Sequence, residues 1–246
     1  VNTGRGNPGA SGIQYMTNNQ GTMRHVRIVS EDGRGYAGLD VSYADEIGPG
    51  FIYDLEVQGF RYGVSAYVLN SLTFEKVRLE GQSVAGFRNY RHVVAIRGLT
   101  SVNTVPAVIN DEYGSMVLLE AQLTGGRGAA SAVINEGYMY ARAISASGYA
   151  RTIENRRGGS PSILTSPAER FVSNPVRSLF PSAPHSLELE IQDTPEVPWD
   201  PLTDWCSPLD FGAIGDGRAD DTRAIQAAID AGKPTVYLPG GKTFKF

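Results

Sequence analysis

The sequence predicts an all-β fold, a right-handed single-stranded parallel β-helix with a short capping α-helix near the C-terminus. Two observations indicate the solenoid. Short runs with alternating apolar residues recur along residues 1–155, and asparagine ends a short run in each repeat. A repeat of about 20–25 residues is typical of solenoids, in which neighbouring repeats complete each other's core. A third observation, a capped helical pattern at residues 220–232, predicts the α-helix.

The alternating runs are the predicted strands of the solenoid. They lie at residues 25–28, 54–57, 74–79, 94–99 and 119–123. Alternation with a period of two places every second side chain on one buried face of a strand. Leucine-rich repeats share the period, but the leucine and asparagine frame that defines them does not occur here. About seven coils spaced by about 4.8 Å would form a rod about 34 Å long.

Asparagine recurs at one point of each predicted coil. The positions are Asn70, Asn89, Asn110, Asn135 and Asn155, at intervals of 19, 21, 25 and 20 residues. Asparagine tolerates the left-handed backbone conformation of a sharp corner, and its side-chain amide can bond to the coils above and below. We therefore predict that these residues form structural corners, with substrate binding as the alternative.

Glycine and proline divide the chain into three predicted parts. Residues 1–155 contain 21 of the 29 glycines and three of the 14 prolines, whereas residues 156–208 contain two glycines and nine prolines. Proline excludes long helices and central strands, so residues 156–208 are predicted to be a connector packed on the solenoid. Its predicted anchors are Phe171, Phe180, Trp199 and Trp205. A disordered linker is the alternative, and residues 209–246 are the third part.

Residues 220–232 have the pattern of a short helix. Asp220 or Asp221 occupies the N-cap position, where a short polar side chain accepts hydrogen bonds from the first free amides. Four apolar residues follow at helical spacing: Ala224, Ile225, Ala228 and Ile229. Gly232 and Pro234 then end the helix. Adjacent aspartates also suggest a glycosidase pair, but capping and the helix dipole explain them without catalysis.

The composition excludes several classes of function. A net charge of −4 gives no electrostatic reason for binding nucleic acid or an anionic membrane. No apolar run approaches the roughly 20 residues of a membrane span, and the single cysteine, Cys206, excludes an internal disulfide framework. The histidines are too scattered for a zinc site and the aspartates form no calcium cluster, so no metal or other cofactor is predicted.

The acidic residues of the coil region concentrate at residues 40–46. Asp40, Asp45 and Glu46 lie there, and Tyr43 offers an aromatic face for a sugar ring. A glycosidase needs two carboxyl groups roughly 5–10 Å apart, so these four residues are the candidate substrate-binding site. The alternative is a solvated turn between coils, and the sequence identifies no catalytic residue.

Residues 210–241, DFGAIGDGRADDTRAIQAAIDAGKPTVYLPGG, resemble the opening segment of pectate-lyase-superfamily parallel β-helices. In that superfamily the segment covers the N-terminal mouth of the solenoid. Residues 12–26, 45–55 and 72–77 resemble parts of the first β-helix of glycoside hydrolase family 55, whose members carry two tandem β-helices. The chain therefore resembles a piece of a larger protein, with the later part of one β-helix, a connector and the truncated start of a second.

The resemblance implies part of a secreted, extracellular exo-β-1,3-glucanase. In that family the cleft lies at the junction of the two helices, and the assigned acid lies on the second. This piece would therefore supply scaffold and cleft wall without the catalytic acid. The implied partners are a polysaccharide, either a β-glucan or a pectin-like chain, and the second β-helix of the same parent chain.

Two other classes of function stay open from the sequence. One is a β-helix that binds glycans without catalysis, such as an adhesin or a phage tail spike. The other is a pectin lyase or an epimerase. Turnover separates the first class from an enzyme, and an unsaturated product separates a lyase from a hydrolase.

Overall fold

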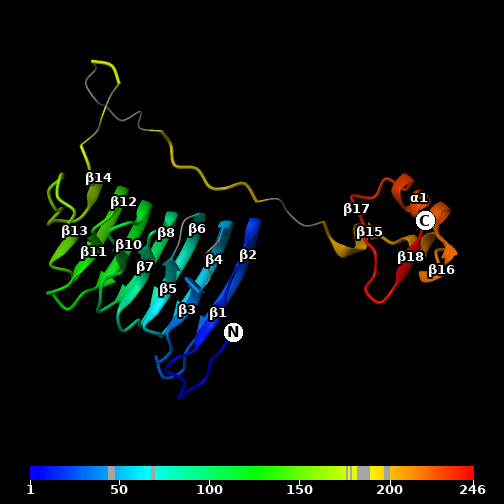
Figure 1. Ribbon diagram of the computed structural model, residues 1–246, viewed down its shortest axis with the longest axis horizontal. Coiled ribbons are helices and arrows are strands. Elements are labelled where there is room, and N and C mark those ends of the chain that lie inside the picture. Colours follow the sequence, from blue (N-terminus) through cyan, green and yellow to red (C-terminus); the bar gives the residue numbers. More distant parts are fainter. Residues whose placement is uncertain (44–47, 68–69, 176, 178, 182–188, 197–199) are drawn as a thin grey trace. The chain divides into compact units, whose positions relative to one another are not determined.

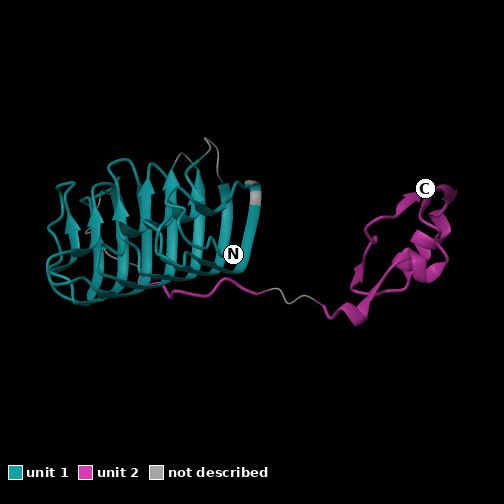
Figure 2. Cartoon of the chain, turned by 90° about the horizontal axis from the view of Figure 1, so that it is seen from below, with its two compact units in different colours: residues 1–184 teal, residues 185–246 magenta. Residues whose placement is uncertain are grey.

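The computed structural model describes residues 1–43, 48–67, 70–175, 177, 179–181, 189–196 and 200–246. The chain divides into two compact units, Val1–Pro184 (unit 1) and His185–Phe246 (unit 2), which are described separately (Figures 1 and 2). Within the described residues, no helix has the length and apolar character needed to cross a membrane.

Unit 1 is a parallel β-helix with two seven-stranded sheets (Figure 1). The sheet of short strands has the order β1 (Ser11–Gln14), β3 (Ala37–Val41), β5 (Tyr62–Tyr67), β7 (Ala85–Tyr90), β9 (Val108–Asn110), β11 (Ser131–Asn135) and β13 (Arg151–Asn155). The other sheet has the order β2 (Asn18–Val29), β4 (Gly48–Gln58), β6 (Ser71–Glu80), β8 (Val93–Asn103), β10 (Ser115–Gly125), β12 (Tyr138–Ser147) and β14 (Ala168–Val172). Neighbouring strands pair in parallel except β14, which is antiparallel to β12. Because successive strands alternate between the sheets, the predicted parallel β-helix is confirmed.

The six long parallel strands share one bend, at a residue with left-handed backbone conformation. These residues are His25, Asp54, Lys76, Gly98, Glu120 and Ala143, with φ between 54° and 67°. The strand register places each of them opposite the next, so they form one continuous corner along the solenoid. A left-handed conformation costs a non-glycine residue about 1–2 kcal/mol, and of these six residues only Gly98 avoids that cost. The bend gives each coil three extended segments.

The apolar pattern of each long strand changes phase at this corner. Phe74 and Val77 in β6 both face the core, and so do Ile96 and Leu99 in β8. Inside each arm the buried apolar residues are two apart, but across the corner they are three apart. One residue forms the corner, which explains why the spacing between core residues increases from two to three at this point.

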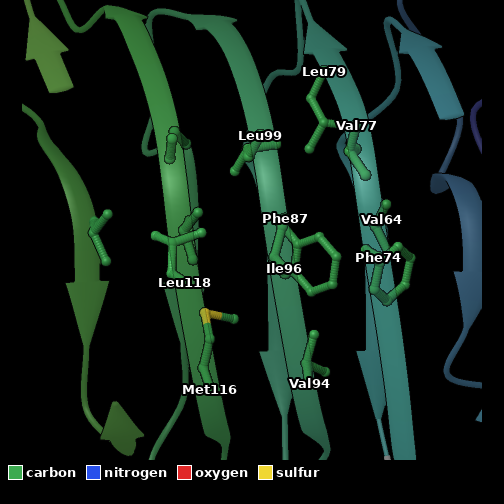
Figure 3. Close-up of a cluster of buried hydrophobic side chains, with 14 of the residues drawn as sticks. Val64, Phe74, Val77, Leu79, Phe87, Val94, Ile96, Leu99, Met116 and Leu118 are labelled. Carbon is green, nitrogen blue, oxygen red and sulfur yellow. The ribbon is translucent and has the colours of Figure 1, made fainter. Parts of the chain in front are cut away.

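Identical core positions stack from coil to coil. Leu55, Val77 and Leu99 are paired in register on β4, β6 and β8, and each is at most 1% exposed. Figure 3 shows Phe87 of the short-strand sheet facing Phe74 of the long-strand sheet, with the rings edge to face and their centroids 5.0 Å apart. Each such fully buried side chain stabilises the fold by about 1.5–3 kcal/mol.

Four of the five repeated asparagines form a buried ladder. The side-chain amide of Asn89 donates to Asn110 over 2.9 Å, Asn110 donates to Asn135 over 2.8 Å, and Asn135 donates to Asn155 over 2.8 Å. The same amides also donate to backbone oxygens of the following turn, for example from Asn89 to His92 over 2.9 Å. The ladder thus ties the turn after each short strand to the coil on either side.

Two features of the ladder differ from the sequence-based expectation. None of the four ladder asparagines has a positive φ, because the left-handed corner lies elsewhere, in the middle of the long strands. Asn70 lies outside the ladder, since Ala66 is the residue in register with Asn89. The Asn70 amide donates instead to the Gly48 carbonyl, and the buried Oδ1 of Asn89 has no hydrogen-bond partner among the described residues.

Residues 156–174 close the C-terminal end of unit 1. Strand β14 covers the edge of β12, and Ile163 forms a bridge to Ile153 of β13. Phe171 of β14 is buried in the core. An open strand edge is a template for pairing with other chains, and the returning segment covers it here.

The predicted aromatic anchors of the connector have different environments. Phe171 packs in the core of unit 1, whereas Phe180 is 77% exposed. Trp205 belongs to unit 2, where its ring lies 5.9 Å from that of Tyr237. Trp199 lies outside the described residues.

Unit 2 contains the predicted short helix. Its elements are η1 (Leu202–Asp204), β15 (Trp205–Cys206), η2 (Pro208–Phe211), β16 (Asp216–Asp220), α1 (Thr222–Asp230), β17 (Thr235–Val236) and β18 (Thr243–Lys245). Strand β15 pairs in parallel with β17, and β16 pairs with β18. Ala224 and Ala228 of α1 are buried, as is Cys206.

The two adjacent aspartates of unit 2 bind backbone amides in different ways. Asp221 occupies the N-cap position of α1, but its carboxylate accepts the amides of Ile214 and Gly215 over 2.8 and 3.2 Å rather than a helix amide. Asp220 accepts the amide and the hydroxyl of Thr222, the first residue of α1, over 3.0 and 2.6 Å. The expected side-chain cap therefore comes from Asp220, and Asp221 fixes the preceding loop.

The other aspartates of this segment also hold turns. Asp210 accepts the Ser207 amide over 2.8 Å, and Asp216 accepts the amides of Ala219 and Arg218 over 2.9 and 2.8 Å. These hydrogen bonds lower the pKa of the Asp216 carboxyl, and those from Thr222 lower the pKa of the Asp220 carboxyl. The carboxylates in the DFGAIGDGRADD segment therefore serve the local fold.

Because of the left-handed corner, we expect substitution by glycine to change the free energy of unfolding differently at Ala143 and at Ala95. We expect Ala143→Gly to leave the free energy of unfolding unchanged or to raise it, because glycine relieves left-handed strain at that position. Ala95→Gly, in the regular part of β8, is expected to lower the free energy of unfolding by about 1 kcal/mol. Urea unfolding of both variants measures the difference, and equal destabilisation would contradict the assignment of the corner.

The asparagine ladder predicts unequal effects at Asn110 and Asn70. Asn110→Ala removes one rung and leaves the buried polar groups of Asn89 and Asn135 without their partner, so we expect a loss of about 3 kcal/mol or more. Asn70→Ala is expected to cost about 1 kcal/mol or less, because Asn70 is half-buried and outside the ladder. Thermal and urea unfolding compare the two, and similar losses would show that the ladder has no special role.

Candidate functional site

Of the candidate residues at 40–46, the structure describes Asp40 and Tyr43, and Asp40 does not face solvent. Asp40 is buried, and its carboxylate accepts hydrogen bonds from Ser11, Gln14 and Ser42. It therefore cross-links the first coils instead of facing a sugar. Tyr43 is exposed. Asp45 and Glu46 lie outside the described residues.

A pocket of about 650 Å³ lies instead at the C-terminal end of unit 1. Its lining residues are Glu112, Glu136, Arg156, Arg157, Gly158, Gly159 and Asn174. Glu112 and Glu136 lie in the turns after β9 and β11, and the arginines follow β13. Equivalent turns of three successive coils therefore line the pocket. The segment that closes the solenoid contributes Asn174.

The asparagine ladder positions these turns. The amides of Asp111, Glu136 and Arg156 donate to the carbonyl oxygens of Asn89, Asn110 and Asn135, each over 2.8 Å. Each pocket turn is thus bonded to the coil before it, directly after a ladder residue.

Gly114 lies where the chain passes close to a ladder asparagine. A Cβ atom on Gly114 would lie 2.2 Å from Asn110 Oδ1, which is too close for any side chain. Gly114 therefore lets the chain between β9 and β10 approach the ladder, and the neighbouring Glu112 reaches the pocket.

Arg156 is held between two carboxylates. Its Nε lies 2.8 Å from Glu154 Oε1, and its Nη1 lies 3.1 Å from Glu136 Oε1. Glu154 also accepts the Ser131 hydroxyl over 2.7 Å. Hydrogen bonds from Arg156 and Ser131 lower the pKa of the Glu154 carboxyl, and those to Glu154 and Glu136 raise the pKa of the Arg156 guanidinium. Arg156 is therefore a scaffold cation whose charge is already balanced.

Arg157 has a different environment from Arg156. Its guanidinium carbon lies 3.7 Å from the centroid of the Tyr138 ring, which is a close cation–π contact. It makes no ion pair with any residue that the structure describes. Its positive charge is therefore not neutralised by a carboxylate of the described chain.

A second pocket of about 410 Å³ adjoins the first. It is lined by Tyr138, Asn174, Pro175 and Arg177. Asn174 lines both pockets, and the contact between Arg157 and Tyr138 joins them. Guanidinium groups bind carboxylates in a planar, two-point geometry, so the pair of pockets suits an anionic ligand.

The four charged residues of the first pocket, Glu112, Glu136, Arg156 and Arg157, were not predicted to form a site. The two arginines lie where the connector was expected to begin. The available signal was their spacing, since all four follow a ladder asparagine by one or two residues. Across the described part of the chain, no group of three or more His, Cys, Asp or Glu side chains is arranged to hold a metal ion.

Comparison with known proteins adds information about unit 2. Residues 205–244 match the family model described as "Rhamnogalacturonase A/epimerase, pectate lyase-like". Over 37 residues, 13% of this chain, the sequence is 68% identical to mannuronan C5-epimerase AlgE3 and to alginate lyase 7, both from Azotobacter vinelandii. It is 62% identical over the same length to mannuronan C5-epimerase AlgE4 from that organism.

These matches support a pectate-lyase-like parallel β-helix protein. They cover 2% of AlgE3, 4% of alginate lyase 7 and 7% of AlgE4, so the chain spans a small part of each relative. None of them points to glycoside hydrolase family 55. The resemblance to the pectate-lyase superfamily at residues 210–241 is therefore supported, and the finer family assignment is not.

The Arg156 network predicts a pH-dependent difference between wild type and Glu154→Gln. The pKa of Glu154 is lowered from its usual 4.5, so its ion pair contributes to stability above pH 4.5 and is lost as the pH falls through the lowered pKa. Because the partners are partly exposed, we expect the variant to lose up to about 1 kcal/mol at neutral pH. The two proteins should converge in acid. Urea unfolding across pH measures this, and a constant difference would contradict it.

Proposed function

We propose that this chain is part of an enzyme that modifies a uronate polysaccharide, by epimerisation at C5 or by β-elimination. The observation that carries the proposal is the 68% identity over 37 residues to proteins named mannuronan C5-epimerase and alginate lyase. The pectate-lyase-like match of residues 205–244 supports the same class of enzyme. Arg157 and Arg177, one in each pocket of unit 1, agree with an acidic substrate, although Glu112 and Glu136 also line the first pocket.

Epimerisation and β-elimination share their first step. A base removes the proton at C5, next to the sugar carboxylate, and the negative charge that develops on the carboxylate must be stabilised. A proton returned to the opposite face of C5 inverts the centre. Loss of the sugar linked through O4 instead breaks the chain and leaves a C4–C5 double bond. Cations near the carboxylate favour both outcomes, which suits a surface with unneutralised arginines.

Hydrolysis of β-1,3-glucan and glycan binding without catalysis are the competing functions. The first depends on the resemblance of residues 12–26, 45–55 and 72–77 to glycoside hydrolase family 55. The relatives found for the chain carry epimerase and lyase names, and a neutral glucan offers no carboxylate for Arg157. We therefore favour the uronate substrate over β-glucan.

The proposal includes the setting of the enzyme. We propose that unit 2 opens a second β-helix of the parent chain, since residues 205–244 match a pectate-lyase-like model. We also propose an extracellular location, because polysaccharides of this kind lie outside the cell. The polysaccharide and the second β-helix are thus the proposed partners.

Incubation of the full-length parent protein with polymannuronate tests the proposed function. We expect C5-inverted residues in the proton NMR spectrum or the ultraviolet absorbance of an unsaturated uronate, and no reducing sugar released from laminarin. Laminarin cleavage with unchanged polymannuronate would replace the proposal by the glucanase function. Binding without any chemical change would replace it by the non-catalytic function.

A further inference from the structure

We infer that the two adjoining pockets of unit 1 form a double subsite for successive residues of an acidic glycan, with Arg157 and Arg177 each binding one sugar carboxylate. The inference rests on the proposed function and deepens it, because it assigns the binding of the acidic chain to unit 1. The pockets, of about 650 and 410 Å³, each have the size of small-molecule binding sites.

Arg157 is the cation best placed to take a ligand. Arg156, its neighbour in sequence, is held by Glu136 and Glu154 and so serves the scaffold. Arg157 makes no hydrogen bond or ion pair with its side chain among the described residues, and its guanidinium lies over the Tyr138 ring, which orients it and leaves its N–H donors available. Two adjacent arginines thus have separate roles, one structural and one for binding.

Tyr138 and Asn174 connect the two pockets. Tyr138 lines the second pocket, while Arg157, which lies on its ring, lines the first. Asn174 lines both pockets; its Oδ1 accepts the Ser173 hydroxyl over 2.8 Å, and its side-chain amide can donate to sugar hydroxyls. Arg177 lines the second pocket, so each pocket has its own cation beside a shared polar residue.

Glu112 adds a carboxylate to the lining of the first pocket. It lines that pocket and has no hydrogen-bond or ion-pair partner among the described residues. Its carboxylate opposes a bound uronate by charge repulsion while it can accept hydrogen bonds from sugar hydroxyls. Removal of the charge by Glu112→Gln should therefore strengthen binding of an acidic sugar, whereas it would not strengthen binding of a neutral one.

Titration calorimetry of the full chain with mannuronate oligosaccharides tests the double subsite. We expect Arg157→Ala to weaken binding about tenfold or more, Arg177→Ala to weaken it by a similar factor, and Glu112→Gln to strengthen it a few-fold. Arg61→Ala is the matched control, because Arg61 also lies over a tyrosine ring, 6.0 Å from the Tyr62 centroid, and is remote in sequence from the pockets. It should bind like wild type.

The outcomes separate this inference from the proposed function. Unchanged affinity in Arg157→Ala, or equal affinity for laminarin oligosaccharides, would overturn the double subsite even if the chain converts polymannuronate. Arginine-dependent binding without conversion would support the subsite and count against the enzymatic proposal alone. If Arg157→Ala lowers the melting temperature, Arg157→Lys replaces it, and the loss of the planar guanidinium should still weaken binding measurably.

Discussion

The in-register stacking of parallel coils is the constraint on which the rest of unit 1 depends. Each strand of a coil forms hydrogen bonds with the equivalent strands of the coils on either side. Equivalent positions of neighbouring coils therefore lie side by side, about 4.8 Å apart. Core residues such as Leu55, Val77 and Leu99 therefore form columns. The same rule aligns a strained corner, which runs through Lys76 and Gly98, and a buried row of amides.

The candidate site follows from this stacking. The equivalent turns of three successive coils lie side by side and together form one surface. The asparagine ladder beneath them holds their backbone in place. Glu112, Glu136 and Arg157 come from three different turns and line one pocket for that reason. The closing segment then supplies Asn174, so the end of the solenoid is also where its pockets form.

The sequence was sufficient for the fold and insufficient for the site, and the reason is physical. Period-two alternation and recurrent asparagine report interactions that repeat from coil to coil, so they predict the solenoid. The capped apolar pattern at residues 220–232 is local and predicts the helix α1. The corner was missed because the step of three between Phe74 and Val77 looks like a break in the alternation. Asn70 was misplaced because asparagine spacing does not reveal register. Arg156 and Arg157 differ in pairing, which depends on Glu136 and Tyr138 of the preceding coil as well as on Glu154 of β13.

Backbone amide hydrogen exchange measured by NMR tests the central claim most directly. The amides of Asp111, Glu136 and Arg156 lie in turns at the protein surface, yet each is bonded to the carbonyl of a ladder asparagine in the preceding coil. If stacking fixes the pocket turns, these three amides exchange as slowly as those of the interior strands. Exchange at the rate of unprotected loop amides would contradict the account, because the turns would then not be held by the coils beneath them.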